Sequence, residues 1–196
     1  MHIQGRSVKR SLHLEKKGIR GLAIAESFRQ DSEKSILSGV IMSNDFVIDG
    51  FVFGNSTLKG DDATEVIIDM YNKVERPDIS YVLISGLVIS LYNIIDIKKL
   101  YDTFQIPIIG VTYKESEGLE ETIKKHFPAD YKEKLEKYSM LGERKKISLD
   151  TSFDLYVRNE GCAVLECKQL LNKITLQGAV PEPLRVAQLL AKTMLD

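Results

Sequence analysis

The sequence predicts an α/β protein with one mixed central sheet and helices on both faces. Two pairs of apolar runs support this prediction. Residues 79–86 and 106–113 are β-branched, short and continuous, as in strands that are covered on both faces of a parallel sheet. Residues 35–43 and 46–54 are separated only by an Asn-Asp pair, which is a hairpin-turn signal. We therefore expect an antiparallel meander followed by parallel crossovers.

The first half of the chain supplies three strands and a helix. A first strand over 19–26 places Ala25 and Glu26 at its carboxyl end, and the hairpin then supplies the second and third strands. Asp62, followed three residues later by a glutamate, forms a capping-box pattern. Apolar residues then recur at helical spacing over 63–74.

The two expected parallel strands need a crossover, and a helix predicted over 87–104 supplies it. Ligands of such sheets bind at the carboxyl ends of the strands, which here carry Ser85-Gly86 and Thr112-Tyr113. A small-molecule site at this edge is one possibility. The sequence has no Gly-rich phosphate loop that would favour a nucleotide there.

The last third of the chain adds helices and one more strand. Residues 117–141 are strongly charged and carry two apolar helical stripes that are separated at Pro128. A strand over 152–158 leads into a helix over 162–171. The last helix begins at the Pro-Glu-Pro segment 181–183, because proline is pre-set for the first helical turn.

Composition sets the outer limits. The 196 residues are 43% hydrophobic and 28% charged, which is ordinary for a globular protein, so we expect one domain over 1–196. Lys+Arg 27 against Asp+Glu 28 gives a net charge of −1, and no whole-molecule field would attract nucleic acid or an anionic membrane. No run has the length of a membrane span, and the N-terminus lacks the apolar core of a signal peptide. These features predict a cytoplasmic protein with no membrane partner.

Positive charge is nevertheless concentrated at one end of the chain. Residues 1–17 form a basic N-terminal arm that includes Arg10 and Lys16. Such an arm could contact the phosphates of nucleic acid, and the alternative is a solvated, partly ordered terminus.

The cysteines and histidines give no metal-site pattern. Cys162 and Cys167 lie five apart in a segment predicted to be helical, which would place them on different faces as reduced, buried thiols. The three histidines are scattered, so no Cys/His metal spacing and no obvious imidazole base is present.

The predicted order of elements is that of the ribonuclease H-like fold. In that group, carboxylates at the end of the first strand, at the first helix and at the end of the fourth strand converge to hold divalent metal ions. The fold alone does not establish this function, so each residue has to be considered separately.

Three segments also resemble a known family. These are Gly-Asp-Asp-Ala-Thr at 60–64, Ser-Gly-Leu…Tyr-Asn-Ile-Ile-Asp at 85–96 and Pro-Glu-Pro-Leu-Arg-Val-Ala at 181–187. They are similar to those of a mostly archaeal family of unknown function that is distantly similar to endonuclease V. The resemblance runs from about Gly18 to the C-terminus, and the last segment is its most specific part.

The sequence departs from that family at the expected metal site. The resemblance implies an Asp that closes the first strand, where this chain has Ala25, and an Asp-Gly pair at the end of the fourth strand, where it has Ser85. Lys59 stands where the family pattern implies another acid. Asp62 is in register, whereas Glu26 would point to the opposite face of the strand from Ala25.

The candidate site residues follow from this comparison. We name Glu26 and Asp62 as catalytic candidates, and Glu26, Asp62 and Asp96 as ligands for weakly bound Mg²⁺ or Mn²⁺. The substrate-binding candidates are Ser85, Asn93, Arg185, Arg10 and Lys16.

Each candidate also has a structural alternative. Asp62 is a natural helix N-cap, and Glu26 would be solvated at a strand end. Asn93 and Asp96 suit caps or surface positions of the crossover helix. Glu182 suits the dipole of the last helix, and Arg185 could pair with Glu182 or with Asp62.

Two functions remain after this comparison. The favoured one is an endonuclease V-like protein that has lost most of its metal-binding carboxylates and binds nucleic acid or a protein partner, with weak or no catalysis. The alternative is a divalent-metal-dependent endonuclease with a rearranged carboxylate site. Two missing ligands at converging strand ends favour the first, because they are hard to replace locally.

Overall fold

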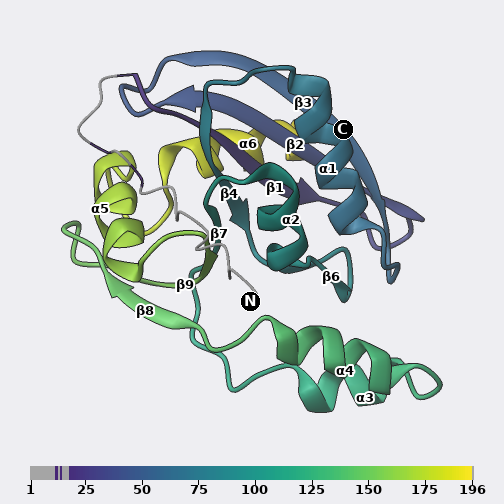
Figure 1. Ribbon diagram of the computed structural model, residues 1–196. Coiled ribbons are helices and arrows are strands. Elements are labelled where there is room, and N and C mark those ends of the chain that lie inside the picture. Colours follow the sequence, from purple (N-terminus) through teal and green to yellow (C-terminus); the bar gives the residue numbers. More distant parts are fainter. Residues whose placement is uncertain (1–11, 13, 15–17, 196) are drawn as a thin grey trace, which may run out of the picture.

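The computed structural model of the protein describes residues 12, 14 and 18–195 (Figure 1). In this part of the chain, seven strands form one mixed sheet with the order β3-β2-β1-β4-β7-β9-β8. Its strands are β1 (Arg20–Ser27), β2 (Lys34–Ser43), β3 (Ile48–Thr57), β4 (Ile79–Ser85), β7 (Ile108–Thr112), β8 (Lys145–Ser148) and β9 (Asp154–Glu160). A separate two-stranded ribbon consists of β5 (Val88–Ile89) and β6 (Asn93–Ile94).

Strand directions match the predicted ribonuclease H-like α/β fold. Strands β1, β2 and β3 form an antiparallel meander, whereas β1, β4 and β7 are parallel. Ile24 of β1 lies opposite Ile84 of β4, so the end of the first strand adjoins the end of the fourth. The expected convergence of the first and fourth strand ends is therefore confirmed. Strand β9 differs, because it runs antiparallel to β7 rather than extending the parallel part.

Helices cover both faces of the sheet (Figure 1). On one face lie α1 (Ala63–Val74) and α2 (Ile97–Phe104), and on the other lie α5 (Val164–Ile174) and α6 (Glu182–Thr193). Helices α3 (Glu120–His126) and α4 (Tyr131–Met140) form a hairpin below the sheet, with the predicted break at Pro128 between them. None of the helices in the described residues is long and apolar enough to cross a membrane.

The predicted crossover helix over 87–104 is wrong in its first half. Residues 87–95 instead form the β5–β6 ribbon, and only α2 is helical. The Ile95 N–H donates to the Leu87 carbonyl at 2.9 Å, which closes the base of the ribbon. Apolar residues in this segment face the α1/α2 layer of the core, and that burial resembles a helical stripe in the sequence.

Two further expectations change near the C-terminus. Strand β8 was not predicted, and α5 begins at Val164 rather than at Cys162. Because Cys162 precedes the helix, the two cysteines do not lie on different helical faces. Their Sγ atoms are 3.5 Å apart, and both thiols are free and buried.

Candidate functional site

The carboxyl ends of β1 and β4 form the edge at which the site was predicted. Ala25 is buried, faces α6 and packs against Val40, Met42 and Ala187. By strand alternation, Ser85 points to the same face as Leu83, which belongs to the α5/α6 layer of the core. The two positions where the family resemblance implies aspartates are therefore neighbours that carry a methyl group and a hydroxyl group.

Glu26 points to the opposite face, toward α1 and α2. Its Oε1 accepts a hydrogen bond from the Ser90 N–H at 2.7 Å, and its Oε2 accepts one from the Ser90 hydroxyl at 2.7 Å. The Ser90 hydroxyl also lies 2.7 Å from the hydroxyl of Ser35, and both serines are fully buried. The alternative of a simply solvated Glu26 is therefore wrong.

Asp62 is the second carboxylate on this face. Its Oδ1 accepts hydrogen bonds from the Ser56 hydroxyl at 3.0 Å and the Asn93 amide at 2.7 Å. The Thr57 N–H lies 3.0 Å from Oδ1, and the Thr57 hydroxyl donates to Oδ2 at 2.7 Å. Asp62 occupies the N-cap position of α1, as the capping pattern predicted, but its carboxylate accepts no hydrogen bond from that helix.

Asn93 takes over that capping role. Its Oδ1 accepts a hydrogen bond from the Ala63 N–H at 3.1 Å, and its Nδ2 donates to Asp62, to the Ser56 hydroxyl and to the Thr57 carbonyl. The side chain is fully buried. One amide therefore connects β3, the start of α1 and β6, which supports a structural role for this substrate-binding candidate.

The hydrogen bonds around Asp62 set its charge. Burial acts to raise the pKa of this carboxyl group, but the bonds from Thr57, Asn93 and Ser56 outweigh burial, and the pKa lies below its ordinary value. The protein therefore stabilises Asp62 as an anion.

The turn between β5 and β6 is strained and joins the two carboxylates. Ser90, Leu91 and Tyr92 have φ values of 45°, 55° and 74°, a conformation that non-glycine residues rarely adopt. Ser90 binds Glu26, and Asn93, directly after the turn, binds Asp62. Strain of this kind persists only where the surroundings over-determine the backbone, and such segments gather at functional sites.

A buried lysine fixes the α3–α4 hairpin to this turn. The Lys134 ammonium donates to the Gly60 carbonyl at 3.1 Å, to Asp61 at 3.1 Å and to the Tyr92 carbonyl at 3.3 Å. It also lies 4.7 Å from the centre of the Phe127 ring. Lys134 therefore links α4 to both sides of the carboxylate network.

The remaining candidates have structural partners or lie outside the described residues. Asp96 caps α2, because its Oδ1 accepts from the Lys99 N–H at 2.9 Å. Arg185 pairs with the buried Glu182 at 2.5 Å, as one of the two expected alternatives. Arg10 and Lys16 of the basic arm fall in the part of the chain that the structure does not describe.

These residues do not fit the metal cluster that the family resemblance implies. Ala25 offers no ligand atom, Ser85 offers a neutral hydroxyl, and both Glu26 and Asp62 already accept hydrogen bonds from the protein. Across residues 12, 14 and 18–195, no three His, Cys, Asp or Glu side chains are grouped so that they could hold a metal ion. Hard cations such as Mg²⁺ need several anionic oxygens that converge on one point.

A pocket of about 390 Å³ opens farther along the same edge of the sheet, where β4 and β7 end. Ser85, Gly86 and Tyr113 line it, as expected from the strand order. Gly86 has a φ of +84°, which a glycine adopts without strain as the chain leaves β4. Arg144 and Arg158 form the far side of the pocket, and the sequence patterns gave no signal for either residue.

The missed site residues have different causes. Ser90 was hidden within a segment predicted as helix, and Lys134 lies in the strongly charged segment 117–141. Arg144 lies outside every predicted element, and Arg158 ends the predicted strand over 152–158. Only the β-branched run at 88–89 and the asparagine at 93 distinguish the ribbon from a helix in the sequence.

Together, the meander, the parallel β1-β4-β7 core and the helices on both faces define a ribonuclease H-like fold, to which solved endonuclease V structures are similar. Endonuclease V of Ciona intestinalis, in complex with a 24mer DNA that contains an inosine followed by a ribo-adenosine, is similar with a TM-score of 0.60 at 15% identity. The match covers 93% of this chain and 87% of that chain. At this identity the likeness shows the fold alone.

The chain belongs to the family described as Endonuclease dU, whose model matches residues 17–195. A UPF0215 protein of Pyrobaculum calidifontis is 32% identical over 171 residues, which is 87% of this chain and 93% of that protein. A protein of unknown function from Archaeoglobus fulgidus has a similar crystal structure, with a TM-score of 0.77 and 24% identity over 89% of this chain and 97% of that one. The family resemblance inferred from the sequence is thus confirmed.

Proposed function

We propose that this protein binds nucleic acid in the manner of endonuclease V-like proteins and that metal-dependent cleavage is weak or absent. The observation that carries the proposal is the pair Ala25 and Ser85 at adjoining strand ends. Neither side chain is a carboxylate, and the two remaining candidate acids, Glu26 and Asp62, accept hydrogen bonds from protein donors. The fold is retained, whereas the two aspartates that the family resemblance implies are replaced by Ala25 and Ser85.

The relatives suggest which nucleic acids to test. The family is described by the name Endonuclease dU, and the Ciona intestinalis enzyme is bound to inosine-containing DNA. Binding should be measured by fluorescence anisotropy with DNA that contains deoxyuridine, inosine or neither. We expect affinity to fall steeply between about 50 and about 200 mM salt, because phosphate contacts release counterions. Affinity that is absent at low salt would contradict the proposal.

Cleavage is tested separately with Mg²⁺ or Mn²⁺ and the same substrates. We expect no more than trace product, unchanged in the Glu26→Gln and Asp62→Asn variants. Efficient cutting that either variant abolishes would overturn the non-catalytic part of the proposal.

That outcome would support the second candidate, an endonuclease with a rearranged site. One observation favours it: the two carboxylates belong to one connected network. The hydroxyl of Ser35 lies between the Ser90 hydroxyl, which binds Glu26, and the Ser56 carbonyl at 3.4 Å. The Ser56 hydroxyl in turn donates to Asp62. The network places two carboxylates on the same face of the sheet, although their hydrogen bonds leave fewer oxygen lone pairs free to bind a metal ion.

The basic arm is a proposed contact with the nucleic acid backbone. Deleting residues 1–17 would be a poor test, because Leu12 is buried against α5 and its N–H donates to Glu166 at 3.0 Å. The better variant neutralises charge with Arg6→Gln, Lys9→Gln and Arg10→Gln. We expect weaker binding and a shallower salt dependence, by roughly one unit of slope per lost phosphate contact. If the variant binds with unchanged affinity across the salt series, the arm does not contact the nucleic acid backbone.

A further inference from the structure

The pocket where β4 and β7 end has an unusual charge distribution. Three cationic side chains line it: Lys114 after β7, Arg144 before β8 and Arg158 on β9. No acidic side chain is among its lining residues. Within the described residues, no carboxylate lies within 4.0 Å of the charged nitrogens of these three side chains.

Both guanidinium groups are nevertheless held in place. Arg144 donates to the carbonyls of Lys114, at 3.1 Å, and Ser116, and its guanidinium lies 5.4 Å from the centre of the Tyr156 ring. Arg158 donates through Nε to the Gly142 carbonyl at 2.8 Å. Its guanidinium lies 5.3 Å from the centre of the ring of Tyr138, a side chain of α4.

These partners orient the arginines without neutralising them. Carbonyl groups and aromatic faces attract a guanidinium but carry no net charge. In the described part of the chain, no protein hydrogen bond uses the two Nη atoms of Arg158. A planar guanidinium with free N–H groups is well suited to bind a phosphate group through two parallel hydrogen bonds.

The opposite wall supplies hydroxyl groups. Tyr113 is largely buried, and its hydroxyl has no hydrogen-bond partner in the described residues. Burial raises the pKa of Tyr113 to about 12, and the nearby Ser85 hydroxyl opposes this rise only in part. The two hydroxyl groups do not reach hydrogen-bond geometry. Tyr113 is thus a neutral donor at physiological pH, beside the partly exposed Ser85.

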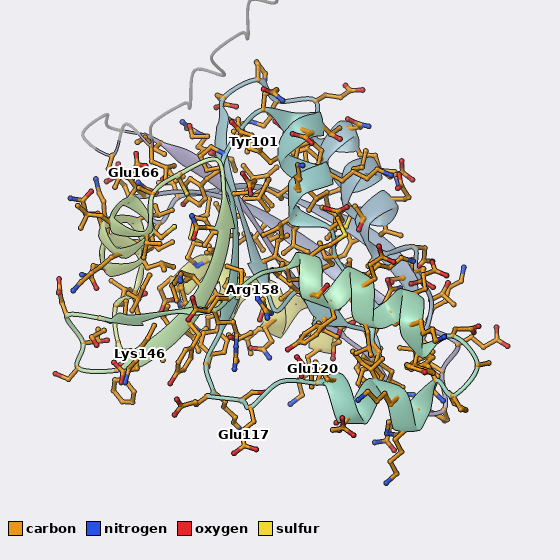
Figure 2. The ribbon with its side chains drawn as sticks, turned by 60° about the horizontal axis from the view of Figure 1, so that its bottom comes forward. Tyr101, Glu117, Glu120, Lys146, Arg158 and Glu166 are labelled. Atoms are coloured by element: carbon orange, nitrogen blue, oxygen red, sulfur yellow. The ribbon has the colours of Figure 1, made fainter. Side chains whose placement is uncertain are left out.

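Apolar side chains also line the pocket, and acidic side chains line an adjoining hollow. Leu87, Val111 and Tyr138 provide surfaces that could contact a ring, and about 390 Å³ is within the usual range for small-ligand sites. This adjoining hollow shares both arginines and is also lined by four glutamates: Glu115, Glu117, Glu120 and Glu143. Figure 2 shows Arg158 at the centre of this face, with Glu117 and Glu120 toward the chain that enters α3.

We propose that this pocket binds a phosphomonoester that carries an apolar or aromatic group, with Arg144, Arg158 and Lys114 as the phosphate ligands. A nucleoside monophosphate is the simplest such molecule. The terminal phosphate of a nucleic acid chain is a second source of the same chemistry. The inference does not depend on the proposed function, because a free mononucleotide can bind whether or not the protein binds longer nucleic acid.

The test is a calorimetric titration of the full chain with AMP, adenosine and inorganic phosphate. We expect AMP to bind, inorganic phosphate to bind more weakly and adenosine to show no measurable binding. Arg158→Gln and Arg144→Gln should each weaken AMP binding by roughly tenfold or more, because each removes charge-assisted hydrogen bonds. Lys114→Gln, which changes an exposed side chain, provides a variant whose folding is not in question.

The matched control is Arg76→Gln. Arg76 follows α1, pairs with Asp78 at 2.7 Å and does not line the pocket, so its loss should leave AMP binding unchanged. Thermal melts of all variants identify any that fail to fold. No AMP binding at millimolar concentration, adenosine binding as tight as that of AMP, or AMP binding unaffected by all three pocket variants would overturn the proposal.

A second arm distinguishes the two phosphate sources. A short oligonucleotide with a 5′-phosphate or a 3′-phosphate is compared with the same oligonucleotide bearing hydroxyl ends. If a terminal phosphate strengthens binding and Arg158→Gln removes that gain, a chain end is the ligand. If terminal phosphates have no effect while AMP binding depends on Arg158, the ligand is a free mononucleotide. Failure of nucleic acid binding alone would refute the proposed function and leave the pocket proposal intact.

Discussion

Asp62 illustrates how single residues at this site differ in role from their sequence pattern. The family resemblance made it a metal-ligand candidate, and the capping-box spacing gave the structural alternative of a helix N-cap. Its oxygens instead accept hydrogen bonds from Thr57, Ser56 and Asn93. The sequence could indicate an acid of structural or functional weight at this position. It could not indicate the direction of the side chain, which depends on a strand and a ribbon distant in the chain.

The Asp62→Asn variant tests the charge of this network. We expect it to lower the free energy of unfolding by about 1–3 kcal/mol at pH 7, since an amide would place N–H groups against existing donors. The pKa of Asp62 is lower in the folded state than in the unfolded state. The ionised side chain therefore stabilises the folded protein fully above the unfolded-state pKa of about 3.9, and this stabilisation is lost as the pH falls through the folded-state pKa. Urea unfolding at pH 7 and near pH 3 measures this.

The control for Asp62→Asn is Asp69→Asn, an exposed change on α1 that should alter stability by less than about 0.5 kcal/mol. The difference between wild type and Asp62→Asn should shrink at low pH, because a protonated aspartate carries no charge either. An equal loss at both pH values would show that shape rather than charge is responsible.

At the scale of elements, the β5–β6 ribbon is the feature that sequence reasoning missed. Its strands have two residues each, so neither gives a periodic signal that can be told from a helix. The ribbon is stabilised by contacts with other parts of the fold: Ser90 with Glu26, Asn93 with Asp62, and the Tyr92 carbonyl with Lys134. Long strands and helices with regular burial, by contrast, were located correctly.

The strain in the turn of this ribbon can be measured with Leu91→Gly. Leu91 has a φ of 55°, and glycine adopts such values without the steric penalty of a side chain. We expect the variant to keep or gain stability, by up to about 1 kcal/mol. The matched control Lys98→Gly, exposed in α2, should lose about 1 kcal/mol because glycine weakens a helix. Equal destabilisation by both substitutions would argue against strain at Leu91.

The attachment of the α3–α4 hairpin depends on Lys134. Lys134→Met retains an apolar stem against Phe127 but leaves the carbonyls of Gly60 and Tyr92 without their donor. We expect a loss of about 2–3 kcal/mol and faster amide hydrogen exchange in α4. Lys137→Met is the control, because this partly exposed lysine pairs with Asp61 and Glu133 near solvent and should contribute less than about 1 kcal/mol.

Amide hydrogen exchange in α4 of the Lys134→Met variant that is as slow as in the wild type would contradict the role of Lys134 in attaching the hairpin. It would show that the apolar contacts of Ile123 and Tyr138 with the core hold the hairpin without the ammonium group.

At the scale of the whole molecule, the antiparallel meander β1-β2-β3 and the parallel pair β4 and β7 were predictable, because the rules behind them are local. A hairpin turn fixes antiparallel neighbours, and a crossover between buried strands fixes parallel ones. The site was less predictable, because the pocket at Ser85 is completed by Arg144 and Arg158 from elements beyond the α3–α4 hairpin. Their positions depend on packing that no local pattern contains.

The metal site that the family resemblance implies can be tested by restoring its two missing carboxylates. We expect Ala25→Asp together with Ser85→Asp to create a divalent metal site, because the register of β1 and β4 makes these positions neighbours on one face. Adjacent strands lie about 4.8 Å apart, so the two new carboxylates could share one cation. Without metal they should repel each other, and the carboxylate at position 25 would lie buried against Val40 and Ala187.

The double variant should therefore melt below the wild type in a chelator and recover several degrees when Mn²⁺ is added at concentrations well above its Kd. The matched control, Ala25→Asn with Ser85→Asn, introduces similar volume without charge and should melt at the same temperature with or without Mn²⁺. A wild-type protein that already gains several degrees from Mn²⁺ would mean that Glu26 and Asp62 release their protein donors to bind the cation. The rearranged endonuclease would then be the better account of this chain.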